Sequence, residues 1–189
     1  TVSANVPNGS GTTGGFVRSW SFFIDADDYA HIVFKDNNGY IYYRRGIPNA
    51  GRTAWTWSAA TIVYANNNRD YPNVVAHREG TGWRAHVVIS LGSGANGAYY
   101  YPVTITSAGV ITAGSEVGLG VGYGNANATY PSIDFNHTGD GKTVKDGTPH
   151  LYVAWSAGAT GSGLGIRFKK ATYSGGSWTW GTEREIDST

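Results

Sequence analysis

Three of the five histidines occupy one position of a repeated pattern, and histidine is well suited to metal binding near neutral pH. His31, His86 and His150 each precede a short apolar run typical of a buried strand. If the three imidazoles faced a common axis, they could bind zinc or copper. A residue that recurs with a structural unit is more often structural. We therefore expect each histidine to cap a buried strand and to bond backbone in the neighbouring turn, with no metal and no cofactor.

His77 and Arg78 form a second candidate group, close in sequence to Tyr71. A polysaccharide lyase needs a base to remove a proton and a cation to neutralise the uronate carboxylate. A histidine next to an arginine could fill both roles. The pair is also typical of a polar turn between two strands, and the sequence favours that interpretation.

Aromatic side chains form the third group, with 13 Tyr and 7 Trp in 189 residues. Exposed aromatic faces can stack on sugar rings, and a surface of low charge rich in Asn can hydrogen-bond their hydroxyls. Packing between sheets would explain many of these aromatics. It explains three consecutive tyrosines less well, because successive side chains in a strand point to opposite faces. We expect ligand binding by Tyr42, Tyr43, Trp83, Tyr99 and Tyr101.

Acidic turns could offer oxygen ligands to calcium. The run Asp36-Asn37-Asn38-Gly39 lacks the spaced acidic ligands of an EF-hand loop, and the pairs Asp140-Gly141 and Asp146-Gly147 are shorter still. Asn and Gly readily adopt the positive φ that tight hairpins need. The sequence therefore predicts a hairpin turn at residues 36–39.

The elements that must position these side chains are predicted to be strands throughout. The 28 Gly interrupt the chain often, and no window has the apolar spacing of a helix. Residues 1–18 are rich in Gly, Ser, Thr and Asn and are predicted to form a linker or arm. Three repeats follow, at about 19–66, 67–124 and 125–189, each with a short apolar strand, a strand opened by His, a Tyr-rich or basic strand and a fourth strand.

Repeats of this size with four strands are typical of propeller blades. We predict an all-β fold of three four-stranded antiparallel repeats, arranged as blades of a β-propeller, with a lectin-like β-sandwich as the alternative.

Several recurring motifs resemble the BNR-type repeats of the sialidase-like propeller superfamily, over about residues 21–186. They are Tyr71-Pro72 and Tyr130-Pro131, the His-apolar-x-apolar strands, and the closing runs Trp55-Thr56-Trp57 and Trp178-Thr179-Trp180. The turns at 49–57 and 173–180 are similar to that family's Asp-box but lack its Asp. In that family the box is a structural turn far from the active site, so it implies no catalysis.

A sialidase-like activity would require more than the repeat. The resemblance implies an arginine cluster for a substrate carboxylate, a Tyr nucleophile with a carboxylate partner, and an acid/base Asp. An early Arg followed by an Asp is matched only by Arg18 and Asp25. Three blades also do not close a propeller, which typically has four to eight. We expect either a longer chain or assembly of copies, such as two chains forming a six-bladed ring.

Composition narrows the class of protein. The net charge of +1 with 14% charged residues provides no basic stripe for nucleic acid, and no apolar run is long enough to span a membrane. No Cys means no disulfide and no thiol chemistry. We expect a non-catalytic module, extracellular, secreted or on a virion surface such as a tail fibre, that binds glycan or mediates assembly with other chains. The alternatives are a hydrolase or lyase acting on acidic glycans, and a purely structural propeller.

Overall fold

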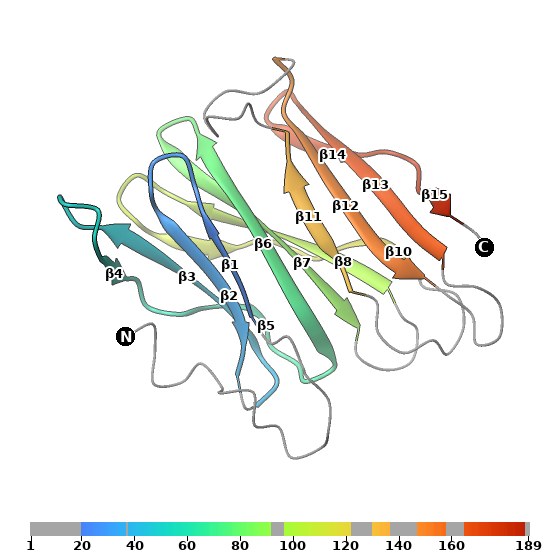
Figure 1. Cartoon of the computed structure of the whole chain (residues 1–189), viewed down its shortest axis with the longest axis horizontal. Helices are drawn as coiled ribbons and strands as arrows, with labels where there is room; N and C mark the ends of the chain where they lie inside the picture. Colours follow the sequence, from blue (N-terminus) through green and yellow to red (C-terminus); the bar gives the residue numbers. More distant parts are fainter. Residues whose placement is uncertain are drawn as a thin grey trace.

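The computed structural model describes residues 20–36, 38–91, 97–121, 130–136, 147–157 and 165–187. Within these ranges the chain forms strands and turns only, arranged as three antiparallel sheets that follow one another along the sequence (Figure 1). The predicted arm and Arg18 lie outside the described residues, as do Asn37, Asp140, Gly141 and Asp146.

Each sheet is a meander of consecutive strands whose fourth strand is broken into two short pieces. Both pieces pair with the third strand. Sheet 1 contains β1 (Trp20–Ile24), β2 (Ala30–Lys35), β3 (Ile41–Pro48), β4 (Trp55–Trp57) and β5 (Thr61–Tyr64). Sheet 2 contains β6 (Arg69–Glu79), β7 (Gly82–Leu91), β8 (Gly97–Ile105), β9 (Ile111–Ala113) and β10 (Val117–Val121). Sheet 3 contains β11 (Ser132–Phe135), β12 (His150–Ala157), β13 (Gly165–Ser174), β14 (Ser177–Trp180) and β15 (Arg184–Asp187).

The prediction of an all-β chain with three antiparallel sheets is therefore confirmed, and none of the sheets closes on itself. The predicted hairpin at residues 36–39 joins β2 to β3. The Asp36 carboxylate accepts hydrogen bonds from the backbone N–H groups of Asn38 and Tyr40, at 3.0 and 2.8 Å. Gly39 has a φ of +89°, which a side chain would strain. The Asp36 carboxylate stabilises a turn here.

The core consists of two layers, one on each side of sheet 2. In layer 1, between sheets 1 and 2, the fully buried Val33 and Ile41 lie in one apolar cluster with Val87. In layer 2, between sheets 2 and 3, Val88 packs in a cluster with Leu151 and Val153. Because both faces of sheet 2 are covered, the run Val87-Val88-Ile89 is buried without the alternation of a half-exposed strand.

The three sheets face the same way along this stack. We call the face that carries the repeat histidine the front face of each sheet, and the opposite face the back face. The front face of sheet 1, with His31, packs on the back face of sheet 2, and the front face of sheet 2, with His86, packs on the back face of sheet 3. His150 alternates with the layer 2 residue Leu151 and so lies on the front face of sheet 3.

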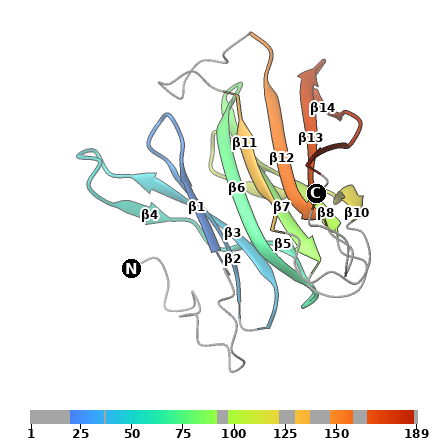
Figure 2. The same cartoon turned by 45° about the vertical axis from the view of Figure 1, so that its right-hand side comes forward.

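The first strands of the three sheets lie near one another, with β1 and β11 both in contact with β6 (Figure 2). The Tyr-Pro motifs of the second and third repeats meet here, because the rings of Tyr71 and Tyr130 are 4.4 Å apart. Tyr71 has a φ of +52° and lies in a bulge where the β6–β7 register shifts. The motif thus connects neighbouring repeats.

Candidate binding site

The structure distributes the described candidate residues over four places. Asp25, Tyr43, Arg78 and Trp83 lie at one end of layer 1, which we call the turn end because it contains the β1–β2 turn. Tyr99 and Tyr101 lie at the opposite end of the same layer, Tyr42 on the back face of sheet 1, and His77 in layer 2.

A buried hydrogen-bond network occupies the turn end. The Asp25 Oδ2 atom lies 3.0 Å from His31 Nε2, and the Tyr43 hydroxyl lies 2.5 Å from His31 Nδ1. Burial lowers the pKa of His31 despite the adjacent carboxylate, and burial raises the pKa of Tyr43. With His31 and Tyr43 fully buried, this acid–base chain stabilises the layer and presents nothing to a substrate.

Trp83 takes part in a stack of aromatic and cationic groups beside this network. The Arg45 guanidinium carbon lies 3.8 Å from the ring centroid of Tyr29 and 3.7 Å from that of Trp83. Arg78 lies 5.1 Å above the Trp83 ring and pairs with Asp27 at 3.3 Å. Because Trp83 is only 7% exposed, its ring packs inside the protein and offers no face for a sugar.

Layer 2 repeats the same network with one change. His86 bonds the Tyr100 hydroxyl through Nδ1 at 2.8 Å and His77 through Nε2 at 3.2 Å. His77 occupies the position of Asp25, since each lies two residues beyond the partner of the repeat histidine. Its ring stacks on Phe135 at 4.3 Å, and burial lowers its pKa to about 4. His77 is therefore a packed member of a repeated network.

The three repeat histidines are buried, and the expectation about their hydrogen-bond partners is corrected. His31 and His86 bond side chains of their own sheets through their ring nitrogens, where bonds to turn backbone were expected. Since each histidine lies on a different sheet, the three imidazoles do not converge. Among the described residues, no group of three or more His, Asp or Glu side chains could hold a metal ion.

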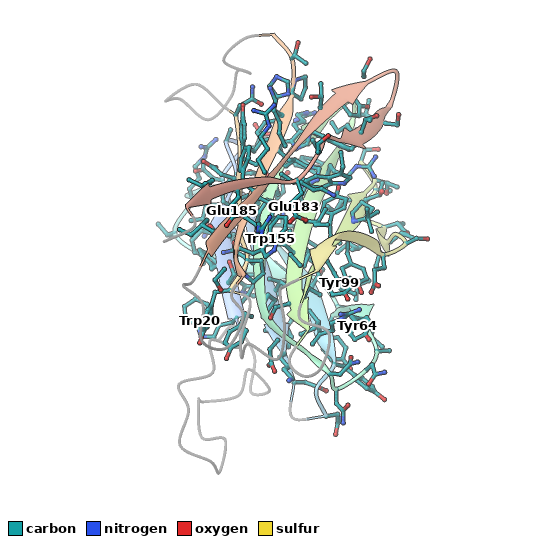
Figure 3. The ribbon with its side chains drawn as sticks, turned by 90° about the vertical axis from the view of Figure 1, so that its right-hand side faces the viewer. Trp20, Tyr64, Tyr99, Trp155, Glu183 and Glu185 are labelled. Atoms are coloured by element: carbon teal, nitrogen blue, oxygen red, sulfur yellow. The ribbon has the colours of Figure 1, made fainter. Side chains whose placement is uncertain are left out.

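The strongest candidate for a ligand lies at the end of layer 1 opposite the turn end. We call it the Arg69 cluster, and it consists of Tyr64, Arg69, Tyr99, Tyr101 and Glu116. Tyr64 ends β5 of sheet 1, whereas the other members come from the start of β6, from β8 and from the segment before β10 in sheet 2. Figure 3 shows Tyr64 and Tyr99 close together at this end. The cluster therefore spans the junction of two sheets.

Arg69 organises the cluster. Its guanidinium carbon lies 3.4 Å from the Tyr99 ring centroid and 5.0 Å from that of Tyr64. Its Nη2 atom lies 3.0 Å from Glu116 Oε2, and the Tyr101 hydroxyl donates to the same oxygen. A planar guanidinium can stack on an aromatic ring and pair with a carboxylate at once. The arrangement holds the rings and the carboxylate in fixed relative positions.

The side chains of the Arg69 cluster differ in their exposure to solvent. The side chain of Arg69 is 7% exposed and that of Glu116 is 38% exposed, while Tyr64 and Tyr99 are half-buried. Burial opposes the charge of Arg69, but the Tyr99 hydroxyl and Glu116 outweigh it and raise the pKa of the guanidinium. Burial and the bond to Glu116 raise the pKa of Tyr101. A buried cation thus supports an accessible carboxylate beside two partly accessible rings.

The sequence predicted ligand binding by Tyr99 and Tyr101 but did not connect Tyr64, Arg69 or Glu116 with them. The sequence does contain a signal for Glu116, because Glu183 takes the same position in the third repeat. Each glutamate directly precedes the second piece of the broken fourth strand. Glu183 and Glu185 both pair with Arg167, at 3.4 and 2.9 Å, near Trp155 (Figure 3). No local sequence signal connects Arg69 to Tyr64 or to Glu116.

The chain matches no family model, no curated protein and no solved structure. In the part of the chain that the structure describes, no helix has the length and apolarity needed to cross a membrane.

Proposed function

We propose that this protein is a non-catalytic, surface-displayed module that binds glycan at the Arg69 cluster, and that its three sheets are diverged BNR-type propeller blades. Three observations support the blade interpretation. The sheets share one meander topology, front-to-back packing occurs in both layers, and the first strands lie near one another. An extracellular or virion location would suit such a module. The observation that carries the binding proposal is the cluster itself.

The cluster offers complementary groups to a sugar. The half-buried rings of Tyr64 and Tyr99 present apolar surface for the C–H face of a pyranose ring, and the 38%-exposed Glu116 carboxylate accepts hydrogen bonds from hydroxyls. Arg69 and Tyr101 fix Glu116 before a ligand arrives, which lowers the ordering cost of binding. This pattern of rigid aromatic surface with a few placed polar groups is typical of small-ligand sites.

A glycan array followed by titration tests the proposal. We expect a binder whose affinity falls by about tenfold or more in Tyr99→Ala and in Glu116→Gln. Tyr173→Ala is the matched control, because Tyr173 is a half-buried tyrosine on sheet 3, outside the cluster, and its loss should leave the affinity unchanged. Equal affinity of Tyr99→Ala and the native protein for the glycan would rule out this site.

A sialidase-like hydrolase is the second candidate, because a tyrosine, a carboxylate and an arginine meet in the Arg69 cluster. Two features oppose catalysis. Tyr101 is 3% exposed with a raised pKa, whereas a nucleophile needs access and a lowered pKa, and Arg69 already pairs with Glu116. Turnover of an acidic glycan that Tyr101→Phe abolishes would establish the hydrolase instead.

A further inference from the structure

The back face of sheet 1 carries four of the large apolar side chains that are exposed among the described residues. On β1, Trp20, Phe22 and Ile24 are 56%, 41% and 43% exposed, and their register partners on β2 place them on this face. Ile62 on β5 pairs with Tyr42 on the same face and is 46% exposed. A solvated face of an antiparallel sheet is normally polar, so several exposed apolar side chains on one face indicate a partner.

The same face is buried in the other two sheets. Ile32, Val87 and Leu151 directly follow the repeat histidines of the three sheets, and all three are buried. Their partners on the first strands differ. Phe22 is 41% exposed, whereas Val74 and Phe135 are 2% and 8% exposed, because the front face of the preceding sheet covers them. Within the described residues, no front face covers the back face of sheet 1. Sheet 1 therefore presents one half of a junction that the chain already makes twice.

The other half of such a junction lies on sheet 3. Its front face carries Tyr152 and Phe168, whose rings stack at 6.0 Å, and the 45%-exposed Ile166. His150 occupies there the position that His31 and His86 occupy in the two existing layers. One chain thus carries a back face and a front face at opposite ends of its stack of sheets (Figure 1).

We propose that the back face of sheet 1 docks on the front face of sheet 3 of a second copy of this chain. A contact between unlike faces closes into a ring when the rotation per copy permits. Two copies would place six sheets in the ring, and this is the only multiple of three within the usual four to eight blades. The inference rests on the blade part of the proposed function and is independent of glycan binding.

Cross-linking tests which faces meet, because the chain has no cysteine. Phe22→Cys labels the back face of sheet 1, and Ile166→Cys labels the front face of sheet 3. Val110→Cys is the control, because Val110 lies in the β8–β9 turn and is 60% exposed. With a short bismaleimide at low protein concentration, we expect covalent dimers from the variant that carries both Phe22→Cys and Ile166→Cys. Each single variant, and Phe22→Cys combined with Val110→Cys, should remain monomeric on a denaturing gel.

Dimers from Phe22→Cys alone would show that two back faces meet, and would overturn the proposal. Light scattering provides the second readout, with twice the 20.1 kDa chain mass expected for the native protein. A native protein that stays monomeric at about 100 μM would also overturn it. Ile24→Asp should weaken the dimer at least about 30-fold, since an unpaired charge would be buried, whereas Val110→Asp should have no effect. Circular dichroism confirms that both variants fold, and glycan binding by a folded monomer would separate this proposal from the binding site.

Discussion

Removal of the Tyr43 hydroxyl tests whether the buried networks stabilise the layers. In Tyr43→Phe the ring is retained, but His31 Nδ1 loses its partner 2.5 Å away in a site where both side chains are fully buried. An unsatisfied buried polar atom costs about 1–3 kcal/mol. We therefore expect the free energy of unfolding to fall by about 2 kcal/mol, which for a chain of this length lowers Tm by about 4–8 °C.

Urea unfolding followed by tryptophan fluorescence measures this loss directly, with the slope of the transition unchanged if the denatured state is unaltered. Tyr42→Phe is the matched control, since Tyr42 is the neighbouring residue on β3, is half-buried, and makes no hydrogen bond through its hydroxyl within the described residues. It should change stability by less than about 0.5 kcal/mol. Tyr100→Phe removes the equivalent bond to His86 and should cost as much as Tyr43→Phe. A loss in Tyr43→Phe no larger than that in Tyr42→Phe would refute the reasoning.

Two further predictions concern acid and packing. Burial lowers the pKa of His77 to about 4 and also lowers the pKa values of His31 and His86, so the unfolded chain binds protons that the folded chain excludes. The free energy of unfolding is therefore highest above pH 6.5 and falls as the pH drops from 6.5 toward 4, by up to about 1.4 kcal/mol per pH unit for each histidine. Urea unfolding midpoints across that pH range measure the fall, and a midpoint that does not change with pH would contradict it. Gly120→Ala would place a Cβ atom 2.8 Å from Cζ2 of the buried Trp155, so we expect a loss of about 1–3 kcal/mol, whereas Gly118→Ala meets nothing within 4 Å and should be tolerated. Equal changes in Tm for the two glycine variants would show that Gly120 on β10 does not pack against Trp155 of sheet 3.

The strands and repeats could be predicted because their signals are local. Alternating apolar residues, glycine-rich turns and the recurring histidines each lie within a few residues of the element that they specify. The packing of one sheet on another depends on residues far apart in the sequence, and it decides which aromatic side chains are buried. Consecutive Tyr100 and Tyr101 are both buried, at 2% and 3% exposure, because sheet 2 is covered on both faces. Packing explains consecutive tyrosines less well only when one face of the sheet is solvated.

The candidate site was harder to predict for the same reason. Arg69 and Glu116 are 47 residues apart, and Tyr64 belongs to another sheet. Only the packing of sheet 1 on sheet 2 brings these side chains together. The recurrence of the histidines is visible in the sequence, but the side-chain partners of His31 and His86 depend on cross-strand register.

The broken fourth strand has a consequence for solubility. An unbroken outer strand would present a row of free N–H and C=O groups, which is a template for pairing with other chains and for fibre growth. Here each outer edge is divided into short pieces, such as β4 with three residues and β5 with four. A protein with only 14% charged residues has little electrostatic repulsion to keep such edges apart. The breaks in the fourth strands therefore protect against aggregation through backbone geometry, as surface charge does in other proteins.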